Sequence, residues 1–290
     1  MSLQVLAAGH LTTVQDRGRP GWAHLGVARA GALDGPAAAL ANRLVGNAVD
    51  AAVLEVTLGG LVVRADRDCW VAVTGAEGPV TVDGAARAHA QAERLRAGAV
   101  LEVGTPWRGV RSYLAVGGGI AVEPVLGSRS TDTLAWVGPP RVEDGTVLPV
   151  GSGPGEPAPH DTPRPPAPGP LRLHPGPRAD WFAGDPLAAL CGAAYRVEGA
   201  SDRVGLRLAG RSLERVRTGE LASEGMVHGA VQVPPSGQPI VFLADHPTTG
   251  GYPVVAVVEP ADLWRCAQLR PGDEVRFTPA RRGGAAAPTR

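Results

Sequence analysis

Residues 245–252, with the sequence DHPTTGGY, concentrate side chains that could perform chemistry. Continuous apolar runs at 240–244 and 254–258 flank this segment and predict two buried strands. Polar loops held between rigid strands often contain catalytic and binding residues. We therefore expect Asp245 or His246 to transfer a proton. Paired glycines allow backbone N–H groups to approach a ligand closely, so we expect substrate contacts from Thr248, Thr249, Gly250, Gly251 and Tyr252.

Three further polar segments could complete such a site. Residues 223–229 (SEGMVHG) offer Glu224 as an alternative base, and His228 follows His246 as the second histidine candidate. Residues 126–132 (LGSRSTD) offer a guanidinium, which can grip a carboxylate with two parallel hydrogen bonds, together with hydroxyl and carboxyl groups from Arg129, Thr131 and Asp132. The alternative for this segment is a network of turns closed by Ser, Thr and Asp side chains.

The third segment, residues 12–21 (TTVQDRGRPG), contains Asp16 close to Arg17 and Arg19. These charges could hold an anion, or they could pair with one another beside a turn. From the residues alone, the ion pair beside a turn is at least as well supported as an anion site at Asp16. Because ligand sites often lie where two domains meet, we expect segments from both halves of the chain to contribute.

Composition excludes several kinds of chemistry. All 28 basic residues are arginine, so the chain has no phosphate-binding lysine loop, Schiff-base lysine or covalent biotin. The formal charge is zero and no arginine run is interleaved with aromatics, so nucleic-acid binding is not expected. The seven histidines show no HExxH or HxH spacing, and we expect no metal site. No serine lies in a GxSxG motif, which argues against an α/β-hydrolase triad.

The same composition favours many short strands. Glycine (40 residues) and proline (28) are abundant, and helical periods are few. A Gly/Pro-rich stretch at 151–170 predicts a linker between an N-terminal domain (1–150) and a C-terminal domain (171–280), with a tail at 281–290. Similar turns and strands in both halves suggest a duplicated β unit. Three widely spaced cysteines and the lack of a signal peptide or an apolar span predict a cytoplasmic protein that enters no membrane.

Three local interpretations concern charged residues near turns and strands. Asp34 precedes Pro36, which favours a helix N-cap over a catalytic role. If Glu55 faces inward from its strand it needs a cationic partner, and Arg64 and Arg129 are the candidates. We interpret Asp202 and Arg203 as residues of a tight turn that forms the fold.

Long motifs carry a family resemblance. The stretch SEGMVHGAVQVPPSGQPIVFLADHPTTGGYP resembles the C-terminal signature of the biotin-dependent carboxyltransferase-like family. The family includes the C subunit of 5-oxoprolinase, allophanate hydrolase subunit 2, the carboxyltransferase part of urea carboxylase and a regulator of a kinase inhibitor. The motifs TTVQDRGRPG, LEVTLGG and YLAVGGGIAVEPVLGSRSTD agree with it, so the resemblance covers about residues 3–280.

The resemblance implies a fold and a function, and it favours Asp16 as a substrate-binding residue. Its members have cyclophilin-like barrels, so we expect a mainly β chain with two tandem β-barrel domains and a few short helices. It implies one component of an ATP-dependent 5-oxoprolinase that works with A-type and B-type partner proteins, with ATP bound only at the level of the complex. Alternatives are a carboxyltransferase for carboxybiotin and urea, or a non-catalytic regulator. Relatives usually have a basic residue after GGYP, where this chain has Val254, and this difference weakens the carboxyltransferase alternative.

Overall fold

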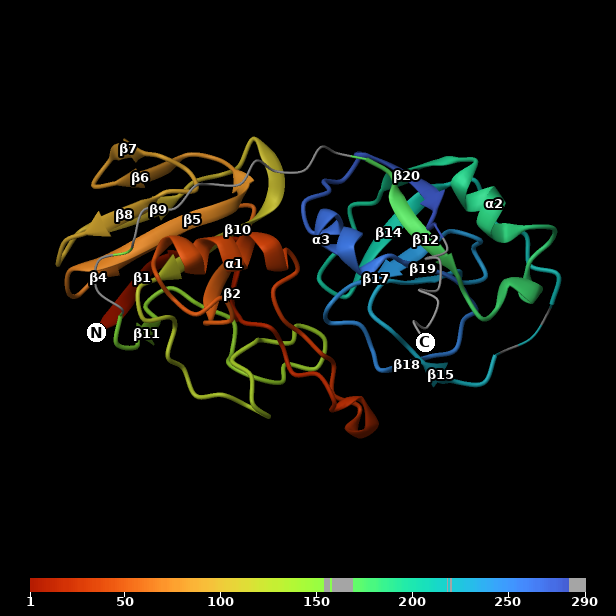
Figure 1. The fold of residues 1–290 in the computed structure, drawn as a ribbon, viewed down its shortest axis with the longest axis horizontal. Coiled ribbons are helices and arrows are strands. Elements are labelled where there is room, and N and C mark those ends of the chain that lie inside the picture. Colours follow the sequence, from red (N-terminus) through yellow and green to blue (C-terminus); the bar gives the residue numbers. More distant parts are fainter. Residues whose placement is uncertain (154–156, 158–168, 218, 220, 282–290) are drawn as a thin grey trace, which may run out of the picture.

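The computed structural model describes residues 1–153, 157, 169–217, 219 and 221–281. Strands dominate, and two strand-rich halves lie side by side along the longest axis (Figure 1). The predicted mainly β fold with a few short helices is thereby confirmed. Most of the predicted linker and of the C-terminal tail lies outside the described residues. Within the described part, no helix is long and apolar enough to cross a membrane.

Two antiparallel sheets make up the first half. The six-stranded sheet has the order β11 (Val147–Pro149), β1 (Ser2–Ala8), β4 (Leu61–Ala65), β9 (Val100–Val103), β6 (Val80–Val82), β7 (Ala85–Arg87). The five-stranded sheet has the order β2 (Leu11–Gln15), β3 (Val53–Thr57), β10 (Arg108–Val116), β5 (Cys69–Glu77), β8 (Ala92–Leu95). Valines and leucines from both sheets form one buried core. This supplies the apolar burial that an aromatic-poor chain must obtain from aliphatic side chains.

The longest helix, α1 (Gly35–Leu44), covers part of the five-stranded sheet. Asp34 caps its N-terminus, since the carboxylate accepts the backbone N–H of Ala37 at 2.9 Å, and Pro36 lies in the first turn. Ala38 and Ala41 bury the inner face of the helix against β5 and β10. The N-cap predicted from the sequence is confirmed, because a cap depends only on local chemistry.

The second half is a closed barrel. Its strand order is β12 (Leu171–Pro175), β19 (Val254–Val258), β16 (Ala230–Gln232), β17 (Ile240–Phe242), β14 (Gly205–Gly210), β13 (Ala194–Val197), β20 (Glu274–Pro279). The barrel is antiparallel except for the parallel pair β12–β20. The two strands predicted on either side of the DHPTTGGY loop correspond to β17 and β19. The short helices of this half are η2 (Ala179–Trp181), α2 (Pro186–Cys191), η3 (Pro260–Asp262) and α3 (Leu263–Cys266), and η1 (Ala23–Leu25) belongs to the first half.

A two-stranded ribbon brings two of the predicted polar segments together. β15 (Glu224–Gly225) pairs with β18 (Thr249–Gly250), and the N–H of Met226 bonds to the carbonyl of Thr248 at 2.9 Å. The SEGMVHG segment therefore lies against the DHPTTGGY loop, as expected for parts of one site.

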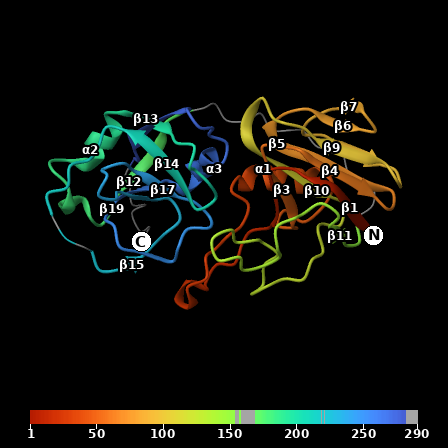
Figure 2. The ribbon, with the colours of Figure 1, turned by 180° about the vertical axis from the view of Figure 1, so that it is seen from behind.

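The two halves are joined by buried contacts close to α3, which lies between them in both views (Figures 1 and 2). The Gln268 amide accepts the N–H groups of Val110 and Arg111 at 2.9 and 3.0 Å, and it donates to Asp34 at 2.9 Å. Leu33, from the first half, packs within the core of the barrel. Each sheet is built from one half, while the domain boundaries at 150 and 171 stay a prediction.

Candidate active site

A cavity of about 360 Å³ opens where the two halves meet. Its wall comes from the end of β2, the segment 29–32, the start of α1, residues 49–51 and, from the second half, His228 and Ala244. Polar and charged side chains on this wall are Gln15, Asp16, Arg17, Arg29, Asn42, Asp50 and His228. The volume is within the range of small-molecule sites. We take this cavity as the candidate active site.

Asp16 fixes one wall of the cavity. Its Oδ1 accepts hydrogen bonds from the N–H of Gly18 (2.7 Å) and the hydroxyls of Ser128 and Ser130 (both 2.6 Å). Its Oδ2 accepts the N–H of Arg129 at 2.6 Å. The two polar loops predicted for the first half thus meet at one carboxylate. The buried Arg19 braces the same loop through the carbonyls of Ser130 and Val125.

Two imidazoles face each other beside the cavity. The rings of His228 and His246 stack with centroids 6.3 Å apart and an interplanar angle of 20°. Burial, followed by the charge of Arg29 and the neighbouring His246, lowers the pKa of His228 to about 4. Burial also lowers the pKa of His246, whose Nδ1 lies 2.7 Å from the carbonyl of Pro247 and must donate to it. Both rings are therefore neutral at pH 7, and the low pKa of His228 means that its protonated form would give up a proton readily.

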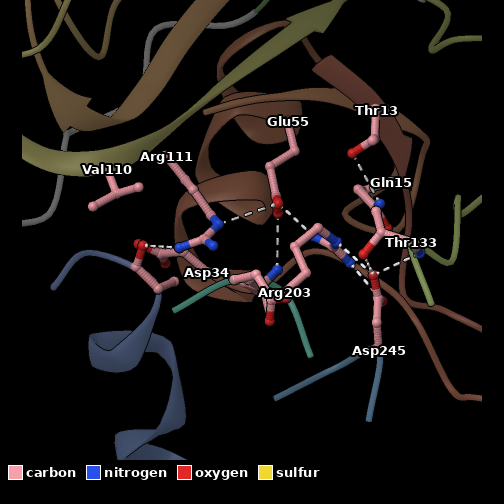
Figure 3. A network of polar contacts seen from close by, with 12 residues as sticks. Thr13, Gln15, Asp34, Glu55, Val110, Arg111, Thr133, Arg203 and Asp245 are labelled. Carbon is pink, nitrogen blue, oxygen red and sulfur yellow. Dashed lines mark hydrogen bonds and ion pairs between the residues drawn. The ribbon is translucent and has the colours of Figure 1, made fainter. Parts of the chain in front are cut away.

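Asp245 follows the wall residue Ala244 and is fully buried. Its carboxylate points towards Arg203 and Thr133 (Figure 3). Arg203 donates to both of its oxygens, Nε to Oδ2 at 2.8 Å and Nη2 to Oδ1 at 3.0 Å. Thr133, from the first half, donates its N–H and hydroxyl to Oδ2 at 2.9 and 2.7 Å. The two bonds from Thr133 join the first half of the chain to the second, so Asp245 helps to hold the halves together.

Glu55 and Arg203 are the centre of this interdomain network. Arg203 binds Glu55 through Nη1 and the carbonyl of Gly31 through Nη2 at 2.8 Å. Glu55 also accepts the Tyr113 hydroxyl at 2.8 Å and pairs with Arg111 at 3.5 Å. Burial alone would lower the pKa of Arg203, but Asp245 and Glu55 outweigh it and raise that pKa. The prediction that Glu55 pairs with Arg64 or Arg129 is wrong, because its cationic partners are Arg203 and Arg111.

The remaining predicted residues of the second half contact the protein itself. Glu224 is paired with Arg178. Thr248 and Thr249 form backbone bonds with Met226 and Gly225. A Cβ on Gly250 would lie 2.8 Å from the Gln232 amide nitrogen, so this glycine allows close packing of the protein's own side chains. Gly251 and the exposed Tyr252 follow in the same loop, outside the cavity wall.

The predicted residues of the 126–132 loop hold the loop together. The Nε of Arg129 donates to the carbonyl of Val122 at 2.6 Å. The buried Asp132 accepts the N–H groups of Leu134 and Ala135, as in the turn network considered as the alternative. Thr131 is buried, and its carbonyl accepts the Gln15 amide at 2.9 Å. The roles of these residues in substrate binding stay predictions.

Sequence reasoning missed Arg29, Arg111 and the network role of Arg203. Arg29 lies in VARAGALD, where no polar neighbour marks it. Arg203 had a signal, since SDR forms a polar turn before a strand, but its partners lie far away in the sequence. Arg17, one of the charges that could hold an anion, does line the cavity.

Asp34 makes the stability of this region depend on pH. Burial raises its pKa to about 6, although hydrogen bonds from Gln268 and Ala37 oppose the shift. The folded state therefore binds this proton more tightly than the unfolded chain, so the stabilisation is complete below about pH 4 and is lost as the pH rises through about 6.

We expect Asp34→Asn to remove this dependence of stability on pH. Unfolding in denaturant at several pH values should show a wild-type slope that differs from the variant by about 1.4 kcal/mol per pH unit between pH 4 and 6. Parallel curves would contradict it.

Comparison with known proteins identifies the relatives of the chain. The family model described as carboxyltransferase domain, subdomain A and B, matches residues 25–279. The chain is 40% identical over 279 residues to the C subunit of 5-oxoprolinase from Escherichia coli (strain K12), covering 95% of this chain and 90% of that protein.

Solved structures agree with this match. The crystal structure of TTHA0988 superposes with a TM-score of 0.87 at 42% identity, over 96% of this chain and 55% of that chain. The K. lactis urea amidolyase superposes with a TM-score of 0.88 at 29% identity, over 96% of this chain and 18% of that chain. The family predicted from the sequence motifs is confirmed. The chain belongs to the family of carboxyltransferase domains with subdomains A and B.

Proposed function

We propose that this chain is the C subunit of an ATP-dependent 5-oxoprolinase, which hydrolyses 5-oxoproline to glutamate. The supporting observation is the cavity between the halves, which places the neutral His228 and the anchored Asp16 around one small-molecule space. The chain that forms it is similar over 95% of its length to a protein named as the C subunit of 5-oxoprolinase.

The groups on the wall fit the opening of a lactam. Water adds to the carbonyl carbon, the C–N bond breaks, and the nitrogen leaves with a proton as an amine. We assign the proton transfer to His228: its ring is unprotonated at pH 7 and so has a free acceptor, and its low pKa favours passing the proton on to the leaving nitrogen. ATP would supply a phosphoryl group to the carbonyl oxygen, which makes the carbon easier to attack; a second water then releases that phosphate, so 5-oxoproline, ATP and two waters give glutamate, ADP and phosphate. Asp245 and Glu224, expected from the sequence to act as bases, are proposed instead to position the loops, because Arg203 and Arg178 occupy their oxygens.

The proposed assembly requires partners. We propose the A and B subunits of 5-oxoprolinase as those partners, in the cytoplasm. The TTHA0988 chain, of which this chain matches 55%, shows that the same fold occurs within a longer polypeptide.

Co-expression with the A and B subunits of the same genome, followed by size exclusion, should give one heteromeric peak. The complex eluting in that peak should convert 5-oxoproline to glutamate only when ATP is present. An intact complex that leaves 5-oxoproline unchanged would overturn the proposed function.

A carboxyltransferase acting on urea is the second candidate, favoured by the superposition with urea amidolyase. The position after GGYP tests it structurally. Val254 is buried against Met226, Ala230 and Phe242, so the side chain at this position carries no charge. Transfer of a carboxyl group from a carboxybiotin carrier protein to urea, measured with the same complex, would support this candidate. Binding without turnover of either substrate would indicate a regulator.

We expect the isolated chain to bind ATP with magnesium no more tightly than millimolar. The chain has no lysine, and the N-terminus of α1, which lines the cavity, is already occupied by the Asp34 carboxylate and by Pro36. A helix N-terminus binds phosphate through free N–H groups, which this one does not offer to a ligand. Calorimetric titration with ATP and magnesium measures the affinity. A dissociation constant in the low micromolar range would show that arginines build a phosphate site in this protein.

A further inference from the structure

Two arginines stand out among the charged groups of the cavity. Arg17 and Arg29 line it, are exposed, and their side chains have no hydrogen-bond or ion-pair partner among the described residues. Two of the acids at this junction are engaged: Asp16 accepts four hydrogen bonds, and Asp245 is held by Arg203. The guanidiniums of Arg17 and Arg29 are therefore the cationic donors left for a ligand.

The backbone places these two arginines on neighbouring segments. The N–H of Arg19 bonds to the carbonyl of Arg29 at 2.7 Å, and the N–H of Ala32 bonds to the carbonyl of Asp16 at 3.0 Å. Glycines permit the close approach, because a Cβ on Gly18 would lie 2.5 Å from the Arg29 carbonyl oxygen. Gly18 has a φ of 78°, which other residues rarely adopt. Arg17 and Arg29 therefore lie on two segments that backbone hydrogen bonds hold side by side.

The charge balance around the cavity favours an anion near these arginines. Burial lowers the pKa of Arg19, and the charge of the nearby Asp16 opposes only part of that shift, so Asp16 acts on Arg19 as well as on its hydrogen-bond donors. Asp50 is the remaining acid on the wall, set against two guanidiniums. Arg29 also acts on His228, where its charge helps to lower the pKa of the imidazole. The anion subsite and the proton acceptor are therefore neighbours.

We propose that Arg17 and Arg29 form a carboxylate-binding subsite that selects amides bearing a carboxylate, such as 5-oxoproline, over amides without one. The inference rests on the proposed function and names the residues that determine its specificity. Guanidiniums bind carboxylates bidentately, which fixes orientation as well as affinity. A ligand held there by its carboxylate directs its amide towards His228. Urea and 2-pyrrolidinone carry no carboxylate and would lack this anchor.

Kinetics of the assembled complex test the subsite. Arg29→Gln and Arg17→Gln should each raise the KM for 5-oxoproline about tenfold to hundredfold, the range for a lost hydrogen bond to a charged group, with a smaller change in kcat. The double variant should lose most of the preference for 5-oxoproline over 2-pyrrolidinone. Arg43→Gln is the matched control, because Arg43 is exposed on α1 and lies outside the cavity wall. Unchanged KM and preference in the double variant would overturn the subsite while leaving the proposed function intact.

Binding to the isolated chain separates the two proposals. Titration with 5-oxoproline, followed by NMR, should show binding that the double variant loses and that Arg43→Gln retains. If the complex hydrolyses no 5-oxoproline but this arginine-dependent binding persists, the proposed function fails and the subsite stands. If neither the chain nor the complex binds 5-oxoproline through these arginines, the subsite is refuted. Matching unfolding midpoints for all variants exclude a loss of fold as the cause.

Discussion

Replacing Arg203 by methionine will lower the free energy of unfolding by about 3–5 kcal/mol, the range measured when one partner of a buried ion pair is removed. Arg203 is 2% exposed and donates to Glu55, Asp245 and the carbonyl of Gly31. Without it, two carboxylates stay buried with fewer donors, and desolvation of their charges is no longer offset. The loss should appear in denaturant unfolding followed by circular dichroism.

Arg207→Met is the matched control for this prediction. Arg207 lies on β14, is exposed, and its replacement should change stability by no more than about 0.5 kcal/mol. A double-mutant cycle adds a second check, since Asp245→Asn should cost less in the Arg203→Met background than in the wild type. Equal losses for the two arginine variants would show that the network contributes no more than a surface charge does.

The interdomain network also shows what the sequence could not predict. Arg203 and Glu55 are separated by 148 positions, and Arg203 is closer in sequence to several other acids. Partner choice at that separation depends on how the barrel packs against the first half, which no local pattern encodes. The wrong pairing of Glu55 with Arg64 or Arg129 followed from considering only its own half of the chain.

Local features could be predicted because they depend on residues that are close together in the sequence. The Asp34 cap depends on residues within one helical turn, and the strands around residues 245–252 follow from continuous apolar runs. The polar loops were located correctly as segments that meet, but their individual residues were harder to assign. Gly250, expected to admit a ligand, instead leaves room for Gln232 and Met226. The sequence shows where a glycine lies, but only the packing shows which side chains approach its Cα atom.

The cavity itself had a partial signal. Asp16 and Arg17 are recognisable because charged residues cluster in a glycine-punctuated loop. Arg29 and His228 carry a weaker signal, since each lies among apolar or small neighbours. Arg29 reaches the cavity because the segment 29–32 forms backbone hydrogen bonds with residues 16–19. His228 reaches it because the second half of the chain forms part of the cavity wall. The site is therefore a product of tertiary contacts between segments whose separate patterns are weak.

Replacing Asp16 by asparagine should reduce kcat/KM of the assembled complex about a hundredfold. Asp16 accepts hydrogen bonds on both oxygens from Gly18, Ser128, Arg129 and Ser130, and asparagine keeps only one acceptor oxygen. Its amide N–H₂ would face at least one donor, so the 126–132 loop must move away. A displacement of about 1 Å in groups that orient a substrate can cost about a hundredfold in rate.

The effect should be separable from unfolding and from general loss of charge. Asp68→Asn is the control, because Asp68 is exposed, also accepts a backbone N–H (from Ala97), and lies away from the cavity. Its kcat/KM should stay within about twofold of the wild type, in line with the small effect of surface substitutions. Steady-state kinetics with 5-oxoproline and unfolding curves for both variants provide the comparison. If Asp16→Asn folds normally and retains wild-type kcat/KM, the carboxylate only closes a turn, and the wall of the cavity tolerates its loss.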